Sequence, residues 1–484
     1  MNPYIALAIL VAYFIMLIVV SYYTSRGADT NTFFTANRQS PWYLVAFGMI
    51  GTSLSGVTFV SVPGAVLNIQ FSYFQVVLGY LLGYLVIGTV LMPLYYRLNL
   101  ISIYSYLGDR FGYWSYKSGS AFFLLSRTVG SAVRLYVAAG VLQLALFEPL
   151  GVPFEVAVAI TILLIWVYTF KGGVKTIIVT DTLQTTFLVT AVILTIVLVS
   201  RELNITGFGD MVSTVKASDY SKIFYWDSND PKNFFKQFFA GAFIAIVMTG
   251  LDQDLMQKNL TCKNIGEAQK NMFWFTVVLV IVNLLFLSLG ALLYLYASSK
   301  GIAFPEKTDD FYPMLALNNL GLVVGITFLL GITAATYASS DSALTALTTA
   351  FCVDFMNVEG KPEAERSTIK FWVHIGFSVL FYVVILIFNQ LNSKEVITAV
   401  FDLAGYTYGP LLGLFSFGLF LKRPVTDRLV PIVCILAPVL TYIINENSAD
   451  WFGGYKMGFE RLMLNGLLTF AGLWLLSLRK KSTV

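Results

Sequence analysis

The sequence predicts an all-α membrane protein. Its 484 residues are 57% hydrophobic and only 12% charged, whereas soluble domains carry about 25% charged residues. Thirteen apolar segments are long enough to cross a bilayer as helices. The one sizeable polar insertion between them covers residues 201–235. We therefore expect thirteen transmembrane helices joined mostly by short loops, with no separate soluble domain.

The expected spans follow the chain in order. They cover residues 3–23, 42–68, 72–97, 119–146, 153–170, 177–200, 236–257, 271–297, 318–355, 370–391, 395–421, 428–445 and 458–478. The stretch at 318–355 is too long for one span, so we expect its polar end to project beyond the bilayer. The first segment has no basic residue before it, which argues against a cleaved signal peptide. We number it zero and the others one to twelve.

Basic residues in the loops predict the orientation, because cytoplasmic loops are enriched in Lys and Arg. Most of them fall on the side that carries Arg26, Arg38, Lys258 and the C-terminal Lys480. We expect the N-terminus outside and the C-terminus inside, in the cytoplasmic (inner) membrane. The 201–235 insertion then forms an extracellular loop, in which we expect some helix.

The segment at 42–68 is interrupted in its middle by the run Gly51-Thr52-Ser53-Leu54-Ser55-Gly56. A helix that only had to span would use Leu, Ile, Val or Phe there. Non-helical backbone at membrane depth occurs where it is buried in protein or lines a cavity. Secondary transporters use such breaks to expose carbonyl groups to ions and substrates. The alternative is that the small residues pack this helix closely against a neighbour.

A second irregular point, Met248-Thr249-Gly250-Leu251-Asp252, occurs five spans later. Five is an odd number, so the two blocks of five spans have opposite orientations in the membrane. A broken first helix in each of two inverted halves indicates a transporter binding site. We expect repeats at 42–200 and 236–421, an extra helix at 1–24 and two further helices at 428–478.

Two other spans carry polar side chains with oxygen atoms. In the 318–355 span, Thr336, Ser339 and Ser340 stand at i, i+3 and i+4 on one helical face. Their hydroxyl groups suit a small alkali cation, although they could instead bond to carbonyl groups of their own helix. In the 177–200 span, Asp181 is a carboxylate inside the membrane, which is costly and functional by default. The alternative is that Asp181 caps its helix or lies at the membrane interface close to Lys171 and Lys175.

One span contains two arginines, Arg127 and Arg134, seven residues apart on one helical face. A guanidinium group keeps its charge and can bind a carboxylate in bidentate fashion. Either arginine could instead neutralise Asp181, Asp341 or Asp402. We expect one of the two to be structural.

Several function classes are disfavoured by the sequence. It contains no P-loop motif, and no nucleophile, metal-ligand set or paired acid and base that would indicate an enzyme. The charge pattern gives no sign of nucleic-acid binding. The single histidine, His374, lies in an apolar span and is expected to be a packed residue. Three cysteines do not make a disulfide framework.

Two sequence runs resemble the sodium/solute symporter family. The run from Tyr168 through Gly172 and Asp181 to Gln184 is similar to the family signature, and the run from Gln257 to Lys270 resembles the segment after span six. The patterns of spans one, two and eight also fit, most closely the bacterial sialic acid and the sodium/galactose symporters. This resemblance implies a LeuT-like core of two inverted five-helix repeats and alternating access. It also implies sodium as the coupling ion, with no other cofactor.

The resemblance further implies the ion-binding residues. The shared sodium site corresponds to the backbone carbonyl groups of Gly51 and Leu54 with the side chains of Thr336, Ser339 and Ser340. A second sodium site in sialic acid members uses the span five aspartate and two further serines of span eight. Here Asp181 and Ser342 match, but the other serine position is Ala343, which leaves the second ion open.

The substrate-binding residues follow the family pattern only in part. Galactose-type members use a glutamate in span two, which this chain lacks, and Ala245, Met248 and Leu279 occupy or neighbour the other positions. Sialic acid members use span one hydroxyl groups, a span two glutamine and a span three arginine. The candidates here are Ser53, Ser55, Thr58, Tyr73, Gln75, Arg127 and Arg134. Gln75 lies near the glutamine position without aligning to it. We prefer Arg127 to Arg134 because its neighbours are small and polar.

These observations predict sodium-coupled import of a small organic solute by alternating access. We expect a carboxylate-bearing substrate such as a sialic acid or another sugar acid. A neutral sugar or polyol is the alternative substrate, and a transporter-like solute sensor is an alternative of a different class. The expected partners are the solute, sodium and the lipid bilayer, without nucleic acid. The expected functional unit is a monomer.

Overall fold

The structure is a computed structural model that describes residues 2–27, 29–169, 173–391 and 396–479. Within these ranges all regular secondary structure is helical, apart from an isolated bridge between Ser40 and Cys262. The all-α fold class is therefore confirmed. Gly172 of the signature run and the basic Lys480 lie outside the described residues.

Nine helices in the described ranges are long and apolar enough to cross a membrane. They are α1 (Pro3–Thr24), the segment Tyr73–Arg97 that begins with α5 (Tyr73–Val86), the segment Tyr113–Leu150 that begins with α8 (Tyr113–Leu142), α10 (Gly173–Glu202), α14 (Ile265–Lys300), α16 (Gly321–Asp354), α17 (Glu363–Leu391), the segment Asp427–Glu446 that contains α20 (Val430–Glu446), and α22 (Arg461–Arg479). A further apolar helix, α9 (Phe154–Thr169), is shorter.

Three pairs of helices in the described ranges are long and apolar enough only when taken together, and each pair meets at a bend of more than 40°. They are α3 (Trp42–Ser53) with α4 (Gly56–Ile69) at 56°, α12 (Phe234–Ala245) and η6 (Ile246–Gly250) with α13 (Gln253–Asn259) at 68°, and α18 (Val396–Thr407) with α19 (Gly409–Phe420) at 44°. The first two bends are at the irregular points that the sequence predicts. The third is not predicted, and it lies just before Pro410, whose ring is incompatible with a continuous helix.

Two helix boundaries differ from the sequence expectation. The 318–355 stretch forms one continuous helix, α16, which begins at Gly321, after the end of α15 (Phe311–Asn318). The turn between them places Gly321 at a φ of +82°, which glycine adopts readily. In addition, α10 begins at Gly173, so Asp181 lies more than two turns inside that helix. Asp181 therefore does not cap α10, and the capping alternative is wrong.

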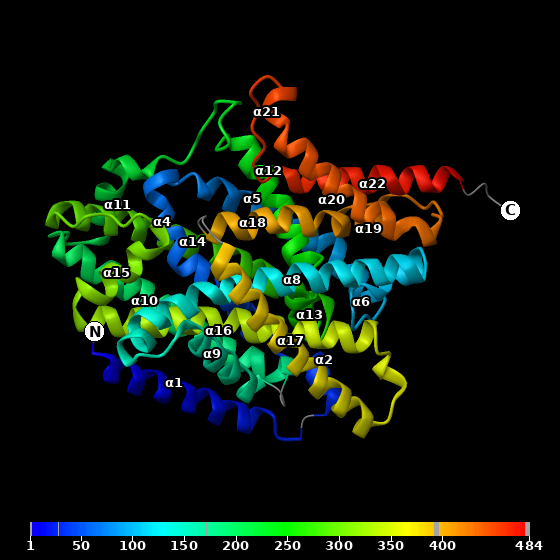
Figure 1. Ribbon diagram of the computed structural model, residues 1–484, viewed down its shortest axis with the longest axis horizontal. Coiled ribbons are helices and arrows are strands. Elements are labelled where there is room, and N and C mark those ends of the chain that lie inside the picture. Colours follow the sequence, from blue (N-terminus) through cyan, green and yellow to red (C-terminus); the bar gives the residue numbers. More distant parts are fainter. Residues whose placement is uncertain (1, 28, 170–172, 392–395, 480–484) are drawn as a thin grey trace.

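Figure 1 shows that α1 begins and α22 ends at opposite ends of the long axis of the molecule. The helix α11 (Phe208–Ala217), which belongs to the 201–235 insertion, lies at the end where α1 begins (Figure 1). The helical content that the sequence predicts for this insertion is therefore confirmed.

The core of the molecule is organised around α16. Every residue of this helix from Gly331 to Ala350 is buried, because α16 packs against α10, α8, α3 and α4. On another side it meets α17, where Nδ1 of His374 lies 2.9 Å from the hydroxyl oxygen of Thr348. His374 is thus a packed residue, as expected. The hydroxyl residues of α16 lie in protein and not in lipid, next to the break between α3 and α4.

Candidate binding sites for ion and solute

The break between α3 and α4 consists of Leu54 and Ser55, whose φ/ψ angles of −90°/69° and −65°/176° are not helical. Carbonyl groups at the end of a helix have no partner in that helix, so those at the end of α3 can act as ligands. A methyl group on Gly56 would lie 2.2 Å from Oγ1 of Thr336, and one on Gly51 would lie 2.4 Å from Oγ1 of Thr185. The glycines therefore allow the break to lie directly against α16 and α10. The run from Gly51 to Gly56 therefore interrupts the helix and also packs closely against its neighbours, so both interpretations of the run apply.

Three hydroxyl groups of α16 are the predicted side-chain ligands, and that of Thr336 lies directly against the break. Oγ1 of Thr336 and Oγ of Ser340 are buried and have no hydrogen-bond partner among the described residues. Ser339 donates to the carbonyl oxygen of Thr336 at 3.0 Å, which leaves the lone pairs of its own oxygen available. Buried hydroxyl groups normally have a partner. These oxygen atoms can therefore serve as ligands for a small cation.

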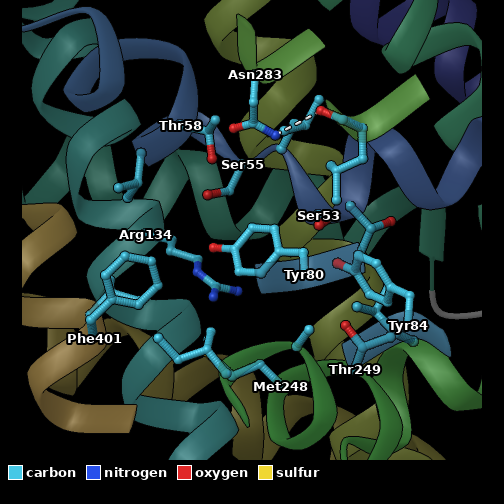
Figure 2. Close-up of a pocket in the computed structure, with 18 of the residues that line it drawn as sticks. Ser53, Ser55, Thr58, Tyr80, Tyr84, Arg134, Met248, Thr249, Asn283 and Phe401 are labelled. Carbon is cyan, nitrogen blue, oxygen red and sulfur yellow. Dashed lines mark hydrogen bonds between the residues drawn. The ribbon is translucent and has the colours of Figure 1, made fainter. Parts of the chain in front are cut away.

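A cavity lies beside the break and is lined by residues of α3, α4, α5, α8, α12, η6, α13, α14 and α18. Figure 2 shows Arg134 and Tyr80 extending into its centre, with the hydroxyl groups of Ser55 and Thr58 on one side and Met248 on the other. The lining also includes Ser53, Tyr73, Tyr84, Ala245, Thr249, Leu279, Asn283 and Phe401. Hydroxyl groups, aromatic rings and a guanidinium group together suit a small polar solute that has a ring and a negative charge.

The two arginines of α8 have different partners. Arg127 is 3% exposed and forms ion pairs with Asp254 and, at 3.8 Å, with Asp252. Arg134 lines the cavity and makes no ion pair among the described residues. Arg127 lines the cavity too, but its charge is already compensated. The structure therefore reverses the predicted preference, and Arg134 is the better candidate for binding a carboxylate.

Gln75 does not line the cavity. Its side-chain amide donates to the carbonyl oxygen of Lys232 at 2.9 Å and accepts from the backbone N–H of Tyr225 at 3.3 Å. Both partners belong to the 201–235 insertion. Gln75 is fully buried and anchors this insertion to α5, instead of contacting a solute in the cavity. Ser53, Ser55, Thr58 and Tyr73, in contrast, all line the cavity as predicted.

Asp181 is fully buried and has two partners. Its carboxylate forms an ion pair with Lys258 of α13, and Oδ2 accepts a hydrogen bond from Oγ1 of Thr52 at 2.9 Å. The expectation that Lys258 lies in a cytoplasmic loop is wrong, since only 1% of its surface is exposed. The bent span carries Lys258 back into the protein interior, where Asp181 compensates its charge.

The residues predicted for a second sodium site have other partners. Ser342 donates to Asp254, the same carboxylate that binds Arg127. Asp181 is held by Lys258 and Thr52, and position 343 is an alanine, whose side chain has no oxygen. Asp181 and Ser342 therefore belong to two different ion-pair networks, those of Lys258 and of Arg127.

The remaining carboxylates of the spans also have partners other than the α8 arginines. Asp341 accepts a hydrogen bond from the Tyr168 hydroxyl group at 2.7 Å. Asp402 forms an ion pair with Arg461 at 3.1 Å. Neither Arg127 nor Arg134 therefore neutralises them directly.

Several residues in and around the two sites were not predicted from the sequence, among them Tyr80, Tyr84, Asn283 and Lys258. Tyr80 and Tyr84 follow Tyr73 at intervals of seven and four residues, a spacing that places all three on one face of α5. Asn283 is a polar residue in the middle of an apolar span, which is a functional signal by itself. Lys258 had no such signal, because basic residues near the end of a span normally lie in a loop.

The sequence is similar to proteins of known function. A family model described as the sodium:solute symporter family matches residues 33–427. A sodium/sialic acid symporter of Aliivibrio fischeri is 26% identical over 463 residues, which are 93% of this chain and 89% of the relative. A sodium/sialic acid symporter of Proteus mirabilis is 23% identical, covering 87% of this chain and 86% of the relative. A sodium-coupled monocarboxylate transporter of Mus musculus is 24% identical, covering 91% and 77%.

Solved structures with the same fold include a sodium-coupled sialic acid symporter in a substrate-bound, outward-open state. It aligns with a TM-score of 0.83 at 20% sequence identity, over 99% of this chain and 98% of that chain. The nucleobase-cation symporter Mhp1 aligns with a TM-score of 0.55 at 14% identity, over 92% and 95%. At these identities the two structures support the LeuT-like transporter fold.

Proposed function

Because the chain belongs to the sodium:solute symporter family, we propose that it imports a small organic acid, such as a sialic acid or another sugar acid, together with sodium. It is a membrane transporter and not an enzyme, and sodium is its coupling ion. Import occurs by alternating access of the central cavity. The observation that carries the substrate class is the guanidinium group of Arg134 in that cavity.

An arginine inside a membrane protein requires a compensating group, because an isolated charge at this depth is costly. The carboxylates of Asp252 and Asp254 lie within ion-pair distance of Arg127, whereas Arg134 has no such partner among the described residues. A carboxylate on the solute would supply the missing charge in a bidentate pair. Two of the similar relatives are sodium/sialic acid symporters, and they support this substrate class.

We propose that the coupling ion binds at the break between α3 and α4. Its ligands are the carbonyl oxygens of Gly51 and Leu54 and the hydroxyl oxygens of Thr336, Ser339 and Ser340. The hydroxyl groups of Thr336 and Ser340 support this assignment, because both are buried and have no hydrogen-bond partner among the described residues. The ion then joins α3 to α16, next to the cavity that holds the solute.

The arrangement in the membrane is also our proposal. We propose that the nine long helices, the three bent pairs and the shorter α9 each cross the membrane, which would make thirteen spans. We propose an external N-terminus, an internal C-terminus and a location in the cytoplasmic (inner) membrane, with a monomer as the functional unit. The repeats comprise 42–200 and 236–421, between the extra helix at 1–24 and the pair at 428–478.

The test compares an acid with its alcohol analogue. We expect purified wild-type protein to bind a sialic acid in the presence of sodium, and to bind the analogue with a reduced carboxyl group more weakly. Arg134→Gln removes a charge-assisted bond worth about 1.5–3 kcal/mol, so affinity for the acid falls roughly ten- to a hundredfold. We expect the same substitution to lower the affinity for the alcohol analogue much less. Arg134→Lys keeps the charge without the planar fork and restores part of the affinity.

Binding is measured by calorimetry, and uptake by labelled solute in proteoliposomes. Arg127→Gln is the matched comparison, because it removes the same group from a position where two aspartates already bind it. We expect Arg127→Gln to change the affinity for the acid and the affinity for the alcohol by the same factor. If wild type binds neutral sugars and no acid, and Arg134→Gln leaves their binding unchanged, the substrate is the neutral sugar or polyol instead.

A further inference from the structure

We propose that the ammonium group of Lys258 takes the place of a second sodium ion beside Asp181, so that the protein binds a single sodium ion per cycle. The inference rests on the proposed function for its one sodium ion and for the transport consequence, but not on the identity of the solute. Three observations support this inference. They are the position of the ammonium group, the partners of the other predicted sodium ligands, and the contact with the helix break.

The ammonium group of Lys258 lies where a cation bound between oxygen atoms of Asp181 and Thr52 would lie. It contacts the carboxylate of Asp181 and the hydroxyl oxygen of Thr52, and both lysine and aspartate are buried. A lysine ammonium group is a compact point charge with the same charge as sodium. Asp181 thus receives from the protein itself the positive charge that a bound ion would otherwise provide.

The other predicted ligands of a second sodium ion do not gather around Asp181. The Ser342 hydroxyl group donates to Asp254 and so belongs to the ion-pair network of Arg127, and the side chain of Ala343 carries no oxygen. Oδ1 of Asp181 has no hydrogen-bond partner among the described residues. A cation at this oxygen would lie next to the Lys258 ammonium group and would be repelled by it, with little water present to screen the repulsion.

The ion pair is directly connected to the helix break. Thr52 lies in the last turn of α3, and its hydroxyl group contacts Asp181, Lys258 and, at 3.4 Å, the carbonyl oxygen of Ala338 in α16. The fixed charge therefore joins α3, α10 and α13 next to the proposed sodium ligands. This connection is present at any sodium concentration, whereas an ion at the same place would dissociate.

The test counts sodium ions bound to purified protein in lipid nanodiscs, by equilibrium binding of radioactive sodium without any solute. We expect one ion per wild-type protein. Lys258→Met leaves the Asp181 carboxylate without compensation, so we expect it to recruit a second sodium ion and to bind two. The double variant Lys258→Met/Asp181→Asn removes both charges and returns to one ion. Lys258→Arg keeps the positive charge and binds one.

Two control variants separate the lysine from other causes. Lys300→Met removes an exposed lysine that pairs with Glu202, and we expect one ion. Ala343→Ser restores the missing hydroxyl group while Lys258 remains, and we also expect one ion, because the ammonium group decides the count.

A count of two ions in wild type overturns the inference, as does a count of one in Lys258→Met protein that is monodisperse and still stabilised by sodium. If Lys258→Met does not fold, a count of one in both wild type and the double variant supports the inference. Failure of the acid-binding experiments would overturn the proposed substrate without changing these counts.

Discussion

Ser340 illustrates how a single side chain defines the proposed ion site. Its hydroxyl oxygen is buried in the most enclosed part of α16 and has no hydrogen-bond partner among the described residues. In a structural role, this hydroxyl group would be expected to bond to a carbonyl oxygen of the preceding turn, as Thr333 and Thr348 do. The absence of such a bond favours a ligand role for Ser340.

Ser340→Ala therefore weakens sodium binding. The lost ion–oxygen contact resembles a hydrogen bond to a charged group, which is worth about 1.5–3 kcal/mol. The sodium concentration for half-maximal thermal stabilisation should rise roughly ten- to a hundredfold. Thr327→Ala on the same helix removes a hydroxyl group that bonds to the carbonyl oxygen of Val323, and its sodium dependence should equal that of wild type. Equal half-saturation in Ser340→Ala and wild type would place the ion elsewhere.

A second prediction at the scale of single residues concerns Gly56. An alanine methyl group would lie 2.2 Å from Oγ1 of Thr336, so either Thr336 or the start of α4 must move. We expect Gly56→Ala to fold but to lose most of its sodium-induced stabilisation. Gly130→Ala is the matched control, because nothing lies within 4 Å of its added methyl group. A normal sodium response of Gly56→Ala would show that this close approach is not part of the ion site.

At the scale of the helices, the ion pairs of Arg127 connect separate parts of the fold. Arg127 of α8 binds Asp254 of α13, and Asp254 also accepts a hydrogen bond from Ser342 of α16. Asp252, at the start of α13, accepts a hydrogen bond from Tyr408 at the bend between α18 and α19. Two of the three bent spans are thus joined to α8 and α16 through one buried network.

Removing one partner of this network leaves an uncompensated buried charge, which typically costs 3–5 kcal/mol. Arg127→Gln and Asp254→Asn should each lower the melting temperature of the purified protein substantially. The double variant should be less destabilised than the sum of the two, because the second substitution removes the charge that the first left unpaired. The measurement is a thermal melt of the four proteins in detergent. Additive losses would show that the two residues do not interact.

The helix breaks show which parts of the fold the sequence predicts. Two glycines that flank three hydroxyl residues mark the break at Leu54, and the irregular run from Met248 to Asp252, five spans later, marks the bend near Gly250. The bend at Tyr408 was not predicted, although Gly409-Pro410 marks it, because the surrounding segment is apolar and of normal length for one span. Hydropathy detects spans reliably, but bends depend on local backbone chemistry.

The sites were predictable only where one segment supplies the residues. Ser53, Ser55 and Thr58 come from one interrupted span, so their joint position in the cavity follows from the break itself. The roles of Arg127 and Lys258 depend on carboxylates from other helices, 127 and 77 residues away in the chain. Such pairings are tertiary contacts, and a single sequence does not show which charges meet.

At the scale of the whole molecule, the two proposals together fix the charge that moves in a transport cycle. Lys258 and Asp181 belong to the protein and return to their starting positions after each cycle, so they contribute no net transfer. One sodium ion carries one positive charge inward, and a monocarboxylate solute carries one negative charge with it. The complete cycle is then electroneutral for an acid and electrogenic for a neutral analogue.

This balance gives a prediction about the driving force of uptake. A potential of 100 mV supplies about 2.3 kcal/mol per transferred charge, which corresponds to roughly fiftyfold accumulation. If two sodium ions accompanied the acid, a negative-inside potential of this size in proteoliposomes would raise steady-state accumulation by about that factor. With one sodium ion, accumulation of the acid should follow the sodium gradient alone and should not change when a potassium diffusion potential is imposed with valinomycin. In Lys258→Met the same potential should raise accumulation, because a second sodium ion then enters with each solute molecule. A wild type that responds to the potential in the same way would exclude the one-ion cycle.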